Sequence, residues 1–344
     1  MKKLILFTII YSLSFSLIKS QNESAQHVSA YQAGSYQTGL MNIRDLADPG
    51  AGIFFVDYNY WNNSNSFYDR FGNKVSGFEI DLSPIDPSLG TTTLDLSQQI
   101  SGYINVPVLF YASKFKILGA RYMASLNPVF LSSNYKMNIH ASRTDTTVIS
   151  SGNTGGMGDF SFIPLGLAWG IKNKLDFSFF YTVYAPTGRY ETGASDNIGK
   201  GYWTHQFQCP TYFYFLEKAT ALFVMPTFEA NGEVKDSDVR PGSRFSVDYG
   251  ISQYVTSWLE LEVLNGHNWQ ISDDKGNDVW WQDTPLYVKD HTSTFSFGVG
   301  VWPWEGRLNV RAKYVMDYGT KQRYKSNFLS LSAIFIPNIL SAGK

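Results

Sequence analysis

Hydrophobic and polar residues alternate along most of this chain, with a period of two residues. The apolar positions are Phe245, Val247, Tyr249 and Ile251 in one segment and Leu308, Val310, Ala312, Tyr314 and Met316 in another. In a third segment Phe54, Val56, Tyr58 and Tyr60 alternate with Asp57 and Asn59. A period of two predicts β-strands with one face in apolar surroundings and the other against something polar.

This alternation predicts about twelve strands, with boundaries good to ~2–4 residues. We expect them near residues 51–61, 98–111, 115–126, 159–170, 175–185, 203–215, 219–230, 242–252, 257–265, 291–301, 306–316 and 323–335. Most of these segments approach the ~9–11 residues that a tilted strand needs to cross a bilayer.

The segments between the predicted strands are alternately short and long. Short turns lie near residues 112–114, 171–174, 216–218, 253–256 and 302–305, and longer polar loops near 62–97, 127–158, 186–202, 231–241, 266–290 and 317–322. This alternation is typical of outer-membrane barrels. Because hydrocarbon offers backbone N–H and C=O groups no partner, strands that cross a bilayer must close into a barrel. The sequence therefore predicts an all-β, closed antiparallel barrel over residues 51–336, with periplasmic turns and extracellular loops.

The amino terminus has the features of a secretory signal peptide. Lys2 and Lys3 precede an apolar stretch from Leu4 to Leu17, and Ser20 offers a small residue for cleavage. We predict removal of residues 1–20; the alternative is an uncleaved anchor, although the stretch is short for a span of ~20 apolar residues. Residues 21–50 show no strand alternation and form either a plug in the barrel or a periplasmic tail. Residues 337–344 are expected to form a tail after the last strand.

Composition narrows the classes of function. Lys and Arg number 28 against 29 Asp and Glu, and the resulting net charge of -1 argues against a protein that binds nucleic acid through its phosphates. The single cysteine, Cys209, excludes a disulfide framework and a cysteine-based zinc site. Aromatic residues make up 16% of the chain, and Trp and Tyr favour the two interfaces of a membrane. We expect no metal ion and no cofactor.

Several stretches resemble one family of outer-membrane proteins. They are NIRDLADPG (42–50), VDYNYW (56–61), GDFSFIPLGLAWG (158–170), APTGRY (185–190) and the run from PGSRFSVDYG to SDDKG (241–276). They resemble the family named for the meta-pathway of phenol degradation, which is similar to the long-chain fatty-acid and aromatic-hydrocarbon transporters of Gram-negative bacteria. The resemblance implies a barrel that passes hydrophobic compounds, and it assigns no residue to a substrate. It also leaves about fourteen strands possible, with a further hairpin in 62–97 or 127–158.

Seven charged residues lie on the polar face of the predicted strands and are expected to face the lumen. They are Arg244, Asp248, Glu260, Glu262, Arg307, Arg311 and Lys313. They could line a polar constriction or hold a plug by ion pairs; alternatively, a water-facing lumen simply tolerates such charges. Their mixed signs argue against a strongly ion-selective pore, which needs a ring of one sign.

Aromatic residues and prolines mark other features of the predicted strands. Phe180, Tyr184, Tyr212 and Tyr214 lie on inward faces, where they could form an apolar path for a ligand or pack against a plug and fill the barrel. Pro128, Pro164, Pro210 and Pro226 fall at or within strands. Since proline cannot donate to the ladder, each predicts a bulge or a local break, which could open a lateral exit to lipid.

No set of residues in the sequence indicates catalysis. A barrel hydrolase needs a Ser–His pair on neighbouring strands, with a third group that orients the histidine. Ser178 and His205 could lie on adjacent strands, but nothing in the sequence shows that they lie at the same level along the barrel axis. The acidic run 272–278 lacks the full calcium-loop pattern. We therefore predict no catalytic residue and a protein that is not an enzyme.

Together these features favour a channel in the outer membrane of a Gram-negative bacterium, for passive uptake of small hydrophobic compounds that are aromatic or fatty-acid-like. The expected partners are the lipid bilayer, the small hydrophobic substrate and the outer-membrane barrel assembly machinery. Two alternatives stay open. One is a structural or adhesive barrel that acts through its extracellular loops, and the other is an outer-membrane barrel hydrolase.

Overall fold

The computed structural model describes residues 34–336, except residues 82, 84–89, 143–144, 172–173, 193, 195, 278–288 and 305. The predicted signal peptide 1–20, residues 21–33 and the predicted tail 337–344 lie outside the described residues. In the described part of the chain, no helix is both long and apolar enough to span a membrane. Two short 3-10 turns are present, η2 (Ile43–Leu46) and η3 (Leu216–Lys218).

The strands belong to one sheet. In chain order they are β1 (Gly52–Tyr68), β2 (Lys74–Val75), β3 (Gly77–Asp81), β4 (Thr91–Ile117), β5 (Ala120–Asn127), β6 (Phe130–Ala141), β7 (Thr146–Met157), β8 (Phe160–Ile171), β9 (Leu175–Ala185), β10 (Thr204–Gln208), β11 (Thr211–Phe215), β12 (Thr220–Asn231), β13 (Arg244–Tyr254), β14 (Leu259–Gln270), β15 (His291–Trp304), β16 (Leu308–Asp317) and β17 (Arg323–Phe335).

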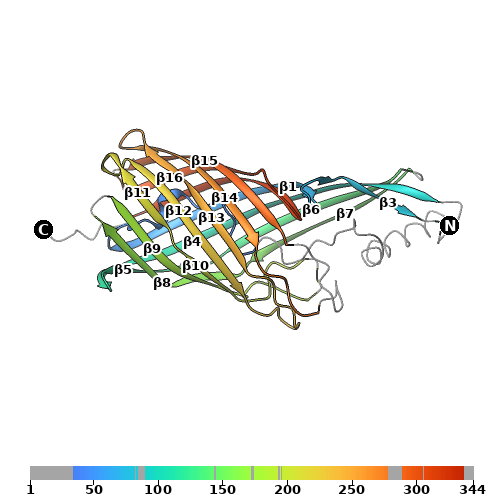
Figure 1. The fold of residues 1–344 in the computed structure, drawn as a ribbon, viewed down its shortest axis with the longest axis horizontal. Helices are drawn as coiled ribbons and strands as arrows, with labels where there is room; N and C mark the ends of the chain where they lie inside the picture. Colours follow the sequence, from blue (N-terminus) through green and yellow to red (C-terminus); the bar gives the residue numbers. More distant parts are fainter. Residues whose placement is uncertain are drawn as a thin grey trace.

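The sheet closes into an antiparallel barrel of 12 strands, as the sequence predicted. Three strands of the wall are each made of two labelled pieces in line, β5 with β6, β7 with β8, and β10 with β11, while β2 and β3 lie in the connection between β1 and β4. β1 pairs with β4 on one side and with β17 on the other, from Phe55 opposite Phe335 to Tyr68 opposite Arg323. This last pairing closes the cylinder (Figure 1).

Two hairpins continue beyond one end of the barrel as an arm, which consists of β2, β3, the first part of β4 (residues 91–102) and the parts of β6 and β7 that extend past the wall (Figure 1). Here β3 pairs with β4, β4 with β6 and β6 with β7. The stretches 62–97 and 127–158 are therefore largely strand, and neither contains a further crossing of the wall. The prediction of loops there was wrong: in β6, for example, Tyr135, Met137 and Ile139 alternate with polar residues, as a strand with one apolar face requires.

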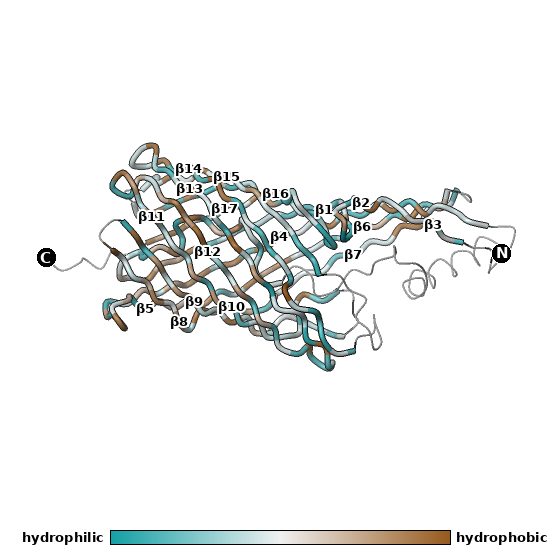
Figure 2. Tube along the Cα trace, in the orientation of Figure 1, coloured by the Kyte–Doolittle hydropathy of each residue, from teal (hydrophilic) through white to brown (hydrophobic). Residues whose placement is uncertain are grey.

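The two faces of the barrel wall meet different surroundings. On β14, Leu261 and Val263 point outward and are 44% and 43% exposed, whereas Glu260 and Glu262 point into the lumen and are 1% and 4% exposed. Figure 2 shows apolar residues along barrel strands such as β12 and polar residues where strands leave the barrel toward the loops. The alternation in the sequence is therefore apolar outward and polar inward on this side of the barrel.

The prolines interrupt the ladder in different ways. Pro128 separates β5 from β6 and Pro210 separates β10 from β11. Pro164 lies at a register shift of β8 against both of its neighbours, which is a bulge. Pro226 stays in register with Val247 of β13, and on its other side it faces the interruption between β10 and β11, which is a local break. Its carbonyl accepts a hydrogen bond from Cys209 N–H (3.1 Å), so its missing N–H faces the break at Pro210.

An arginine at Val263 tests whether the outer face of β14 meets hydrocarbon. We expect Val263→Arg to lower the free energy of unfolding by about 2–4 kcal/mol, because a guanidinium deep in the bilayer loses its hydration. The matched control, Ser97→Arg, places the same side chain at an exposed position of β4 in the arm, where we expect no measurable loss. The measurement is urea unfolding in lipid vesicles, and equal losses for the two variants would contradict this placement.

Candidate functional site

The first described residues of the chain, 34–50, lie inside the barrel and are called the inner segment below. The chain passes from this segment almost directly into β1, which begins at Gly52. Tyr36, Ile43 and Leu46 of the segment are buried. Because the segment has little secondary structure of its own, its backbone polar groups need partners on the barrel wall.

Charged side chains of the wall supply several of these partners. The Ile43 N–H donates to Glu262 Oε2 (2.9 Å), and Lys313 Nζ donates to the Met41 carbonyl (2.6 Å). Lys313 Nζ also lies 2.5 Å from Glu262 Oε1. One buried ion pair on β14 and β16 therefore holds both a donor and an acceptor of the inner segment.

Arg311 joins the inner segment to β14 in a second ion-pair cluster. Its Nη1 lies 2.7 Å from Asp45 Oδ1, and its Nη2 lies 2.6 Å from Glu260 Oε2. Arg44 completes the cluster with Nε 3.2 Å from the other oxygen of Glu260. The side chains of Arg311, Asp45 and Glu260 are at most 4% exposed. Buried charges of this kind are tolerated only as a paired set, so each depends on the others.

Asp248 of β13 holds the part of the inner segment that precedes these clusters. Its carboxylate accepts hydrogen bonds from the Tyr36 hydroxyl and from the Gly39 N–H (3.0 Å to Oδ1). On β14, Gly266 leaves room for this contact, since a Cβ there would lie 2.3 Å from Asp248 Oδ1 and 2.6 Å from Thr38 Cβ. The segment is thus fitted closely to the wall.

A third cluster lies where β13, β15 and β17 meet the loops. Arg244 binds Asp290 through two parallel hydrogen bonds of 2.8 and 2.6 Å, and Arg323 Nη1 lies 3.3 Å from Asp290 Oδ2. Burial opposes ionisation of Asp290, but the two arginines outweigh it and hold the pKa of this carboxyl below its usual range. Arg323 also donates to Gln37 Oε1 (3.2 Å), which ties this cluster to the inner segment.

Six of the seven charged residues expected in the lumen are buried there: Arg244, Asp248, Glu260, Glu262, Arg311 and Lys313. The exception is Arg307, for which the prediction was wrong. It is exposed in the turn before β16, and its guanidinium carbon lies 5.9 Å from the centre of a Trp304 ring. β16 begins one residue later, so the wall does not fix the direction of this side chain.

The four aromatic residues expected to form an apolar path lie in two different surroundings. Phe180, Tyr212 and Tyr214 pack in the core cluster that also contains Ile43 and Leu46 of the inner segment. They fill this part of the barrel beside the inner segment. Tyr184 instead borders a cavity, and its hydroxyl donates to Gln206 Oε1 (3.3 Å).

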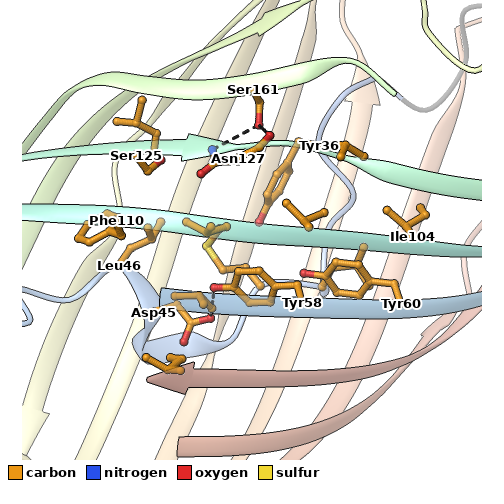
Figure 3. A pocket seen from close by; sticks show the side chains of 18 of the residues that line it. Tyr36, Asp45, Leu46, Tyr58, Tyr60, Ile104, Phe110, Ser125, Asn127 and Ser161 are labelled. Atoms are coloured by element: carbon orange, nitrogen blue, oxygen red, sulfur yellow. Dashed lines mark hydrogen bonds between the residues drawn. The ribbon is translucent and has the colours of Figure 1, made fainter. Parts of the chain in front are cut away.

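The cavity has a volume of about 660 Å³ and lies between the inner segment and the opposite part of the wall. Its apolar lining comes mainly from β1, β4, β6 and β8: Val56, Ile104, Val106, Val108, Phe110, Leu131 and Ile163. Figure 3 shows Tyr58 and Tyr60 of β1 side by side along this space. Their rings are nearly parallel, with centres 6.0 Å apart, and the Tyr58 hydroxyl donates to Asp45 Oδ2 (2.7 Å). Apolar and aromatic side chains therefore make up most of the lining.

One part of the cavity is polar. Lys200, in the connection between β9 and β10, donates from Nζ to Ser35 Oγ (3.2 Å), and its backbone N–H donates to Asp159 Oδ2 (2.8 Å). Burial lowers the pKa of Lys200 to about 8, although the carboxylates of Glu229 and Asp159 work in the opposite direction. The cavity thus combines a long apolar lining with polar groups, among them Ser125, Asn127 and the weakly basic Lys200.

The orientation of β1 was not predicted. Val56, Tyr58 and Tyr60 line the cavity, whereas Asp57 is exposed on the outer face and accepts a hydrogen bond from Asn105 Nδ2 (2.7 Å). The polar face of β1 is therefore the outer one, opposite to β14. The only signal in the sequence was that Ile53, Phe55 and Trp61, on the same face as Asp57, are also apolar.

The residue pair considered for a hydrolase does not come together. Ser178 is buried in the lumen and donates to the Leu46 carbonyl (3.4 Å), whereas His205 lies on the outer face, 2.7 Å from the Tyr181 hydroxyl. Within the ranges that the structure describes, no group of three or more His, Cys, Asp or Glu side chains is placed to hold a metal ion.

Removal of Arg311 tests the dependence of the inner segment on its ion pairs. We expect Arg311→Met to lower the free energy of unfolding by about 3–5 kcal/mol, because Asp45 and Glu260 are left buried without their common partner. The double variant Arg311→Met with Glu260→Gln should recover part of this loss. Urea unfolding of both proteins is the measurement, and an equal or greater loss in the double variant would contradict the assignment.

The fold resembles that of a solved bacterial channel. The COG4313 outer membrane channel from Pseudomonas putida F1 matches with a TM-score of 0.61 and 15% identity, over 86% of this chain and 99% of that one. The TodX deltaS2S3 mutant, a monoaromatic hydrocarbon channel, matches with a TM-score of 0.45 and 9% identity, over 83% of this chain and 90% of that one. A Pseudomonas aeruginosa FadL homologue matches with a TM-score of 0.40 and 10% identity, over 84% and 91%. At these identities the first likeness shows the fold alone.

Sequence comparison identifies the family. No curated protein sequence matches the chain. The family model described as "Putative MetA-pathway of phenol degradation" matches residues 64–333, which is well over half of the chain. The resemblance seen in the sequence is therefore confirmed, and the chain belongs to this outer-membrane barrel family.

Proposed function

We propose that this protein is an outer-membrane channel for the passive uptake of small hydrophobic compounds, aromatic or fatty-acid-like. The observation that carries the proposal is the cavity of about 660 Å³ inside a closed barrel, lined mainly by apolar and aromatic side chains. Sites for small apolar ligands have this character, with a few polar groups that orient the ligand. Membership of the family and the likeness to the Pseudomonas putida channel support the same conclusion.

The charges of the lumen are consistent with an uncharged solute. Arg311 is paired with Asp45 and Glu260, and Arg244 is paired with Asp290. These pairs leave no ring of one sign of the kind that selects ions. An apolar solute in the cavity therefore replaces water without separating buried ion pairs.

The wall also supports a sideways exit into lipid. The pairing of β4 with β6 ends at Asn105, and its pairing with β5 resumes at Leu109, so Val106–Val108 lie at a gap in this ladder. A hollow on the wall at this gap is lined by Pro107 and Pro128 and shares Val56 and Val108 with the lumen cavity. We propose that solutes pass between cavity and bilayer here. The remaining partners in this proposal are the bilayer itself and the barrel assembly machinery that inserts the protein.

Filling the cavity tests the proposed uptake. In a deletion strain complemented with Ile104→Trp, we expect uptake of labelled toluene or octanoate to fall toward the level of the uncomplemented strain, because the indole occupies the apolar part of the cavity. The control is Tyr103→Trp, which changes the neighbouring side chain on the outer face of the same strand and should leave uptake normal. Normal uptake with Ile104→Trp, or with no protein at all, would refute the proposal.

A further inference from the structure

β7 forms an open edge of the arm. Among the described residues only β6 pairs with it, since β8 continues the wall by pairing with β5 and β9. Alternate residues of an edge strand direct their N–H and C=O groups away from the sheet. At the barrel end of β7, Arg189 Nη2 donates to Thr154 Oγ1 (3.0 Å), which in turn donates to the Asp196 carbonyl (2.8 Å). The open part of the edge is therefore residues 147–153.

This edge lacks the devices that normally protect a strand from pairing with another chain. Protected edges are short, or carry charged residues or proline. The 12 residues of β7, TTVISSGNTGGM, include neither a charged residue nor a proline, and Ile149 is 62% exposed. β3, which pairs on the other side of the arm, has 5 residues and carries Glu79 and Asp81. One edge strand of the arm is thus protected and the other is not.

We propose that the β7 edges of two copies of this chain pair with each other when the copies lie in facing membranes. Two copies in one membrane point their arms the same way, so their β7 strands run in the same sense along the membrane normal. Copies in facing membranes point their arms toward each other, so the strands run in opposite senses, as antiparallel pairing requires. Residues 147–153 carry no charge, so self-pairing opposes no like charges.

The size of the edge determines how such a contact acts. A contact of a few strand residues is much smaller than the ~1,200–2,000 Å² that stable interfaces bury. A single pair of arms therefore binds weakly, whereas two membranes that each carry many copies gain from multivalency. The inference is thus a homophilic contact between membranes, in addition to the proposed uptake and independent of it.

Clustering of vesicles tests this proposal. The full barrel is reconstituted into phosphatidylcholine vesicles, and clustering is followed by light scattering. We expect vesicles with the natural protein to cluster, and a synthetic peptide of residues 146–157 to disperse them by occupying the edge. The double variant Ile149→Lys with Ser151→Lys places two charges on the edge and should abolish clustering. The control Asn134→Lys adds a charge at an exposed position of β6, inside the sheet, and should cluster normally.

Mixed vesicles decide whether both edges are required. Vesicles with the natural protein should not cluster with vesicles that carry the double variant, and heat-modifiable mobility on gels checks that each barrel is folded. Clustering in this mixture would show that the partner surface is not a second β7 edge and would overturn the proposal. Absence of clustering with the natural protein would overturn it as well.

Discussion

Every backbone N–H and C=O group that lies in hydrocarbon must find its partner within the protein, and the closed ladder meets this requirement. The pairing of β17 with β1 removes the last free edge from the membrane. Pro226 has no N–H to donate, and its nitrogen faces the break between β10 and β11 at Pro210. The missing donor and the break in the neighbouring strand therefore coincide. Among the described residues, β7 has one edge without a strand partner, in the arm outside the barrel, where water can bind its backbone groups.

Closure creates a lumen whose polar face must also be satisfied, and the inner segment contributes to this. Asp45 gives Arg311 a second carboxylate, and the backbone of Ile43 and Met41 meets the Glu262–Lys313 pair. Because these charges are buried, loss of one leaves the others without compensation. The same contacts that neutralise the lumen therefore fix the position of the segment.

The cavity follows from the asymmetric position of the inner segment. Its apolar side chains pack with Phe180 and Tyr212, so the space near β9 and β11 is filled. On the side of β1 and β4, the wall turns tyrosine and aliphatic side chains into the lumen, and the space stays open. The gap in the ladder beside Pro107 lies on this same side. The apolar cavity and the gap in the hydrogen-bonded ladder of the wall therefore lie side by side, which is the physical basis of the proposed uptake.

The sequence by itself determined the closed barrel and the inward direction of charges such as Glu260 and Arg311, because a period of two and the lengths of connections are local properties. It favoured twelve strands but left fourteen possible, and the structure decided for twelve. Only the tertiary structure decided what depends on distant residues. Asp45 and Arg311 meet across 266 positions, and no local pattern identifies such partners. In β1 both faces are partly apolar, so the lumen side was set by neighbouring strands and by the inner segment. The arm also escaped prediction: Tyr135, Met137 and Ile139 of β6 alternate with polar residues, but no local pattern shows that β4, β6 and β7 pair beyond the barrel.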